Sequence, residues 1–136
     1  MDIFSHALAG AATGFAFNNP ILGAVIAVTP DIPIFGPRKE NPPLLYKFTH
    51  SILFLIIGVI VGSFYNVGAL VFYCLFSHLL LDIPTHGPVW APRLLWPYGG
   101  IMVAAKEWEF FNRTWYYGLA LTVTWSTLWI LIQRQL

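Results

Sequence analysis

Three long stretches without a formal charge constrain this chain more than any other feature. No Asp, Glu, Lys or Arg occurs in residues 3–30, 48–81 or 114–133. A helix of about 20 mostly apolar residues spans the hydrocarbon core of a bilayer. Only 10% of the chain is charged, whereas soluble domains carry roughly 25%. We therefore expect an all-α integral membrane protein.

Turn signals divide these stretches into about five helices within one domain, residues 1–136. The sequence "NNP" at 18–20 predicts that the first two helices form a short hairpin. Pro84 ends the fourth helix, because proline cannot continue the hydrogen-bond ladder. The expected elements are the hairpin over 3–29, a loop over 31–43, helices over about 44–65, 67–83 and 114–132, and a tryptophan-rich interfacial segment over 87–113.

Topology gathers all four histidines on one side of the membrane. A hairpin that enters the membrane and returns has both ends on one side, and the polar loop after it cannot cross. The next helix therefore starts on that side, and the helix after it returns there. The residues gathered in this layer are His6, Asp31, His50, His78, Asp82 and His86.

Imidazoles and carboxylates in one membrane layer indicate a metal site. His78 and Asp82 are four residues apart, so they share one helix face. Ionisable groups within membrane segments cost about 2.5–3.5 kcal/mol and usually mark a function. With Cys74 as the single cysteine, thiolate-rich sites are excluded. We expect a divalent transition metal, zinc first, with manganese, iron or nickel as alternatives. The competing interpretation is a set of interfacial histidines in contact with water.

A hydroxyl residue directly precedes every histidine. Metal-binding imidazoles need a partner on the other ring nitrogen, and a hydroxyl can help to supply it. The alternative is that two of these residues, Ser5 and Thr49, cap helices. The predicted second-shell residues are Ser5, Thr49, Ser77 and Thr85.

Five motifs follow one another in a family order: "DIFSHALAG" at 2–10, "PD" at 30–31, "THS" at 49–51, "SHLLLDIPTHG" at 77–87 and "LLWP" at 94–97. This pattern resembles the YdjM-like family of small membrane-bound hydrolases, which are described as metal-dependent. The similarity runs from about residue 2 to the "EWEFFNRTW" region at 107–115. It implies as metal-site residues His6, Asp31, His50, His78 and Asp82, with His86 found in a subset of relatives.

The chain departs from the family pattern at two positions. Pro33 stands where many relatives have a second aspartate, and Leu45 stands where many have a histidine. Both changes remove possible ligands, which weighs against a two-metal centre, and His86 compensates in part.

The basic residues suggest an orientation. Arg38, Lys39, Lys47, Arg93, Lys106 and Arg113 fall on the side of the histidines, and Arg134 falls on the other side. The positive-inside rule then places the site at the cytoplasmic face of a prokaryotic inner membrane, with the C-terminus outside. The start "MDIFSHALAG" lacks a basic region, so we expect no removable signal peptide. The absence of a basic cluster beyond residues 38–39 argues against nucleic-acid binding.

The leading functional hypothesis is a hydrolase that uses a metal-activated water on a lipid-like or membrane-delivered ester or phosphoester. Asp31 and Asp82 are the candidate catalytic carboxylates, with Asp31 as general base. Lys47 and Arg93 are candidate anchors for the substrate. The alternative is a non-catalytic metal-stabilised membrane scaffold or a metal-ion transporter. The sequence leaves the oligomeric state open.

Overall fold

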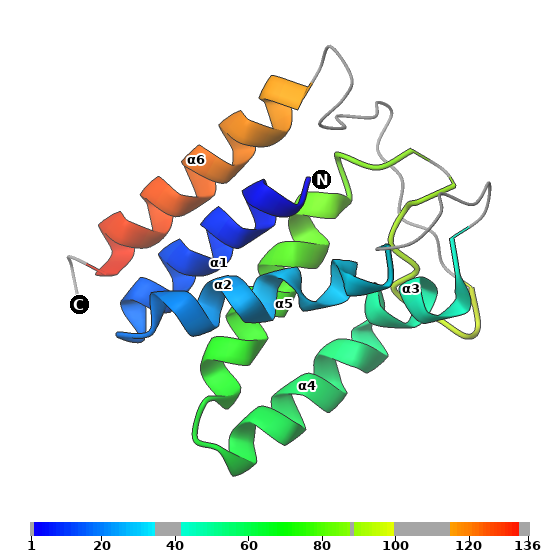
Figure 1. The fold of residues 1–136 in the computed structure, drawn as a ribbon, viewed down its shortest axis with the longest axis horizontal. Coiled ribbons are helices and arrows are strands. Elements are labelled where there is room, and N and C mark those ends of the chain that lie inside the picture. Colours follow the sequence, from blue (N-terminus) through cyan, green and yellow to red (C-terminus); the bar gives the residue numbers. More distant parts are fainter. Residues whose placement is uncertain (1, 35–41, 88, 100–114, 134–136) are drawn as a thin grey trace.

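A computed structural model describes residues 2–34, 42–87, 89–99 and 115–133. These residues form helices and contain no β-strand, which confirms the all-helical class. The elements are α1 (Ile3–Ala16), α2 (Pro20–Val28), the 3-10 helix η1 (Thr29–Ile34), α3 (Leu44–Thr49), α4 (Ile52–Phe64), α5 (Gly68–Asp82) and α6 (Trp115–Gln133). Figure 1 shows α1 between α2 and α6, with α5 crossing behind α2 and α4 returning beside α5.

The first two helices form the predicted hairpin (Figure 1). Asn18 makes the turn in the left-handed backbone region, at φ 55°, which asparagine tolerates better than most residues. Asn19 then caps α2, since its side-chain oxygen accepts a hydrogen bond from the N–H of Leu22 at 3.3 Å. Pro20 takes the first helical position, where its missing N–H costs nothing.

Glycines allow the hairpin helices to touch backbone to backbone. A Cβ added to Gly10 would overlap both Ala27 and the carbonyl of Gly23. The α4–α5 pair uses the same device, because a Cβ on Gly62 would lie 2.7 Å from a methyl group of Val71. Small residues at such crossings are typical of membrane helix pairs.

The single helix predicted over 44–65 is wrong, because the chain breaks at His50 and Ser51 to give α3 and α4. The Ser51 side chain caps the new helix α4. The segment after α5 satisfies the backbone groups at the break: Arg93 N–H donates to the His50 carbonyl at 3.1 Å, and Ile52 N–H donates to Leu94 at 3.0 Å. Partners this distant in sequence leave no local signal of a break.

The start of η1 and the end of α5 position two aspartates, Asp31 and Asp82. The predicted loop over 31–43 begins instead as the 3-10 helix η1, which carries Asp31, and residues 35–41 of that loop lie outside the described ones. Helix α5 ends at Asp82, close to the predicted end. Backbone N–H groups of Thr85 and His86 then both donate to the Asp82 carbonyl, at 3.1 Å each, which folds the chain back over the helix end.

Within the described segments, no helix has both the length and the apolar character required to cross a membrane. The integral membrane bundle therefore stays a prediction. Of the predicted interfacial segment, Trp90 and Trp96 are described and are half-buried. Trp108 lies outside the described residues.

Filling the hairpin contact should destabilise the protein. We expect Gly23→Leu to lower the free energy of unfolding by about 1–3 kcal/mol or more, since the added side chain meets backbone atoms of Gly10 and Gly14 that cannot move aside. Val25→Leu is the matched control on the same helix, because Val25 is exposed. Thermal unfolding of the purified proteins tests this, and equal midpoints for the two variants would refute the close packing.

Candidate metal centre

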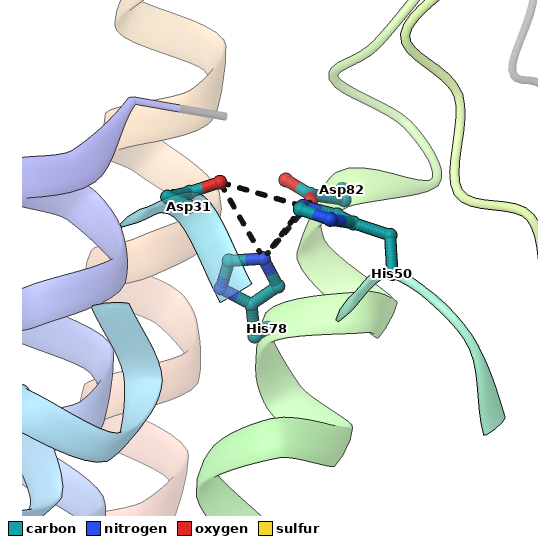
Figure 2. Close-up of side chains that lie close together, drawn as sticks. All are labelled: Asp31, His50, His78 and Asp82. Carbon is teal, nitrogen blue, oxygen red and sulfur yellow. Dashed lines mark hydrogen bonds and ion pairs between the residues drawn. The ribbon is translucent and has the colours of Figure 1, made fainter. Parts of the chain in front are cut away.

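Four side chains from three elements converge at one end of α5 (Figure 2). Their candidate ligand atoms all lie within 4.8 Å of one another. Asp31 comes from η1, His50 from the end of α3, and His78 and Asp82 from one face of α5. Each of these side chains is at least 96% buried. We call this set the four-residue group: Asp31, His50, His78 and Asp82.

The distances within this group suit one tetrahedral ion. The Nε2 atoms of His50 and His78 are 3.1 Å apart, and each lies 3.2 Å from Oδ2 of Asp82. Oδ1 of Asp31 lies 3.4 Å from the first of these nitrogens and 3.8 Å from the second. Ligands bound about 2.0–2.1 Å from a tetrahedral zinc ion lie about 3.3–3.4 Å from one another. The observed separations fall on both sides of that value.

Backbone carbonyls fix the protonation pattern of the two imidazoles. His78 Nδ1 lies 2.7 Å from the Ala27 carbonyl, and His50 Nδ1 lies 3.0 Å from the Tyr46 carbonyl. A carbonyl oxygen only accepts, so each Nδ1 carries the hydrogen and donates it. In a neutral ring the Nε2 atom is then a bare acceptor, which is the form that binds metal.

When both rings are neutral, two bare Nε2 atoms therefore point at each other and at carboxylate oxygens. Four acceptor atoms so close together repel one another unless a positive charge lies among them. A proton shared with one imidazole or a metal ion can supply that charge. The carbonyl contacts behind both rings match the second-shell pattern of metal sites.

Asp31 adds a buried anionic oxygen to the group. Burial alone would raise the pKa of Asp31, but the nearby imidazoles of His78 and His50 lower it to about 2. Among the described residues, neither carboxylate oxygen of Asp31 accepts a hydrogen bond. A buried carboxylate usually has donors or a cation, so these oxygens remain available to a bound ion.

The remaining two histidines, His6 and His86, contact the second carboxylate oxygen of Asp82, and we call them the second histidine pair. His6 Nε2 is 2.8 Å from Asp82 Oδ1, and His86 Nε2 is 3.1 Å from the same oxygen. The structure thus brings all six predicted metal-site residues together. His6 also stacks on His78, with ring centroids 3.8 Å apart.

Only one of the four predicted second-shell hydroxyls contacts an imidazole. Thr49 Oγ1 lies 3.2 Å from His50 Nδ1. The capping alternative is also wrong for Ser5, since Asp2 caps α1. The other three hydroxyls donate elsewhere: Ser5 to the Asp2 carboxylate, Ser77 to the Cys74 carbonyl and Thr85 to the Leu81 carbonyl. Backbone carbonyls contact the Nδ1 atoms of His50 and His78 instead. Every residue has such a carbonyl, so the sequence does not show which ones are used.

Tyr46 is a supporting residue that the sequence analysis missed. Its ring stacks on His50, with centroids 3.7 Å apart and planes at 26°. Its hydroxyl donates to the Trp90 carbonyl at 2.9 Å, and the side chain is buried. Tyr46 therefore holds His50 from behind through both its ring and its backbone carbonyl.

Lys47 and Arg93 are the two predicted anchors for the substrate, and no described contact joins their side chains to Asp31. Lys47 and Arg93 are half-buried. Arg93 acts through its backbone N–H, which binds the His50 carbonyl.

Removal of the Tyr46 ring should weaken metal binding. We expect Tyr46→Ala to raise the Kd for Zn²⁺ about 10–100-fold, since His50 loses its stacking partner and its orientation. Tyr46→Phe keeps the ring and loses only the bond to Trp90, so it should change the Kd much less. Competition with a chromophoric chelator measures both, and an unchanged Kd for the alanine variant would contradict the supporting role.

Comparison with known proteins places this chain in one family. A family model described as YdjM inner membrane protein matches residues 1–135. Neither a curated protein nor a solved structure matches the chain. The family match agrees with the motif order in the sequence and covers every described residue of the candidate metal centre. The chain therefore belongs to the YdjM family of inner membrane proteins.

Proposed function

We propose that this chain is a membrane-embedded, metal-dependent hydrolase that acts on a lipid-like or membrane-delivered ester or phosphoester. One observation carries the proposal: two buried imidazoles turn their Nε2 atoms toward each other, 3.1 Å apart, beside two buried carboxylates. Such a concentration of acceptors is stable only around a positive charge. A divalent metal ion meets that requirement, and zinc is the proposed ion, with manganese, iron or nickel as alternatives.

Exposed apolar side chains support the membrane location. Large hydrophobic residues are exposed along several helices, including Ile21 at 79% and Phe64 at 82%. Large exposed apolar side chains in such number are typical of surfaces that contact lipid or a partner protein. Helix α4 has 13 residues, about 20 Å of length, which reaches through about two-thirds of the hydrocarbon core. Membership of an inner membrane family supports the same location.

The proposed orientation puts the metal centre at the cytoplasmic face. The centre lies at one end of α5 rather than at its middle, since Asp82 is the last helical residue. Lys47 and Arg93 belong to the segments beside this end, in agreement with the positive-inside rule. The other basic residues behind this orientation, Arg38, Lys39, Lys106, Arg113 and Arg134, lie outside the described residues.

In the proposed reaction, different residues of the four-residue group bind the metal ion and accept the proton. His50, His78 and Asp82 would hold the metal ion. When bound, such an ion supplies Lewis acidity and activates water as a nucleophile near neutral pH. Asp31 is the proposed acceptor of the proton of the attacking water, because its two carboxylate oxygens are buried beside the metal ligands and accept no hydrogen bond among the described residues. Asp82 is the second proposed catalytic carboxylate, held in place by His6.

A metal-stabilised scaffold is the second candidate function, and one observation favours it. Four protein donors at tetrahedral separations fill the coordination shell of a zinc ion, as structural zinc sites do. Such a site would tie η1, α3 and α5 together without chemistry.

Metal content tests the first half of the proposal. Protein purified from the detergent-extracted membrane fraction should carry stoichiometric transition metal, and His78→Ala and Asp82→Ala should each lose most of it, because each removes a central donor. Ser63→Ala, an exposed change in α4, is the control that keeps its metal. Elemental analysis measures this. Wild-type protein without metal, even after supplementation, would defeat the proposal.

Hydrolysis assays separate the enzyme from the scaffold. Metal-loaded protein in lipid vesicles should hydrolyse at least one member of a panel of carboxylic esters and phosphoesters. Asp31→Asn should lower kcat about 10²–10⁴-fold, because the amide cannot accept the proton. A metal assay on the same variant shows whether the ion is retained. Metal-loaded wild type that cleaves nothing in the panel would favour the scaffold.

A further inference from the structure

The geometry points to a second metal position beside the first, formed by His6, His86 and the outer oxygens of the two carboxylates. Asp31 and Asp82 would then bridge two ions, and Asp31 would act as a ligand rather than as the free general base of the one-ion arrangement. This inference rests on the proposed metal binding and deepens it.

Asp82 divides its two oxygens between two pairs of histidines. Oδ2 lies 3.2 Å from Nε2 of both His50 and His78. Oδ1 lies 2.8 Å from Nε2 of His6 and 3.1 Å from Nε2 of His86. Each oxygen therefore belongs to a different pair of imidazoles.

Asp31 repeats the same division. Its Oδ1 faces the first pair, at 3.4 Å from His50 and 3.8 Å from His78. Its Oδ2 faces His6 of the second pair, at 3.9 Å from Nε2. Carboxylates that give one oxygen to each of two ions are a common bridge in two-metal sites, where the ions lie about 3.5–4 Å apart.

The ring arrangement opposes convergence of all the imidazoles on one ion. His6 and His78 are stacked, with planes at 22° and centroids 3.8 Å apart. Both rings turn Nε2 toward Asp82, but toward different oxygens, so their nearly parallel lone pairs are aimed at two neighbouring points. The rings of His50 and His78 lie at 62° instead, which lets their lone pairs meet at a single point.

Two ions also suit hydrolysis better than one. Six protein donors on a single ion would leave no place for water or substrate. Division between two ions gives each ion two imidazoles and one oxygen from each carboxylate. Manganese or iron then has coordination positions left for water and an oxygen of the substrate. The loss of family ligands at Pro33 and Leu45 does not prevent this arrangement, because His86 contributes to the second pair.

The two positions should differ in affinity. Each imidazole of the first pair donates its Nδ1 hydrogen to a backbone carbonyl. His6 Nδ1, although buried, has no hydrogen-bond partner among the described residues. A missing second-shell partner costs about 10–100-fold in metal affinity. The second position should therefore fill after the first.

Manganese titration tests the inference directly. Calorimetry of the metal-free wild type with Mn²⁺ should show two ions, the second bound at least ~10-fold more weakly. The double variant His6→Ala/His86→Ala should bind one ion with nearly the wild-type first Kd, whereas His50→Ala/His78→Ala should lose the tight ion. Electron paramagnetic resonance at two equivalents should show an exchange-coupled manganese pair in the wild type and an isolated ion in His6→Ala/His86→Ala.

The outcomes separate the two proposals. Saturation of the wild type at one ion, or an uncoupled spectrum at two equivalents, overturns the second position and leaves the proposed function intact. Absence of any bound ion overturns both. If the double variant fails to fold, the wild-type spectrum alone decides, since coupling requires two ions that share a bridge.

Discussion

The structure depends on the contact between His50 and His78, whose Nε2 atoms face each other at 3.1 Å inside a buried site. When neither nitrogen carries a hydrogen, this contact is repulsive, and the two buried carboxylates beside it add negative charge. A positive charge converts the same arrangement into mutual attraction. Such a charge would join the elements around it, because the side chains come from η1, α3 and α5 and His6 adds α1. Fold and proposed chemistry thus share one requirement.

Close helix packing explains how the imidazoles are held. Gly10 and Gly23 let α1 and α2 approach until Ala27 is buried against α1. The carbonyl of Ala27 then reaches His78 at 2.7 Å and fixes which ring nitrogen carries the hydrogen. The close contact between α1 and α2 therefore determines which ring nitrogen of His78, on α5, carries the hydrogen. The orientation of a metal ligand here depends on backbone geometry as much as on side-chain chemistry.

Sequence patterns predicted most of the helices and the gathering of the site residues at one end of α5, but neither the break at His50 nor the contacts that support the site. Charge-free stretches and the "NNP" turn predicted the hairpin, and counting crossings predicted that His6, Asp31 and His50 reach the end of α5. The break at His50 escaped prediction because its hydrogen-bond partners, Arg93 and Leu94, are more than 40 residues away. The carbonyls behind the imidazoles escaped as well, since every residue has one and only the tertiary fold selects which are used.

The break between α3 and α4 shows why an apolar run can contain a polar site. A continuous helix would bond the His50 carbonyl to a residue four positions later and keep the chain straight. Here the carbonyl accepts from Arg93 instead, Ser51 caps a new helix, and Tyr46 packs against the His50 ring. The interruption turns His50 toward Asp31 and Asp82 and satisfies the freed backbone groups from a distant segment. In a low-dielectric setting such irregular backbone persists only where protein surrounds it. The helix break therefore places His50 in the site, and a positive charge bound there would in turn stabilise the turn that the break creates.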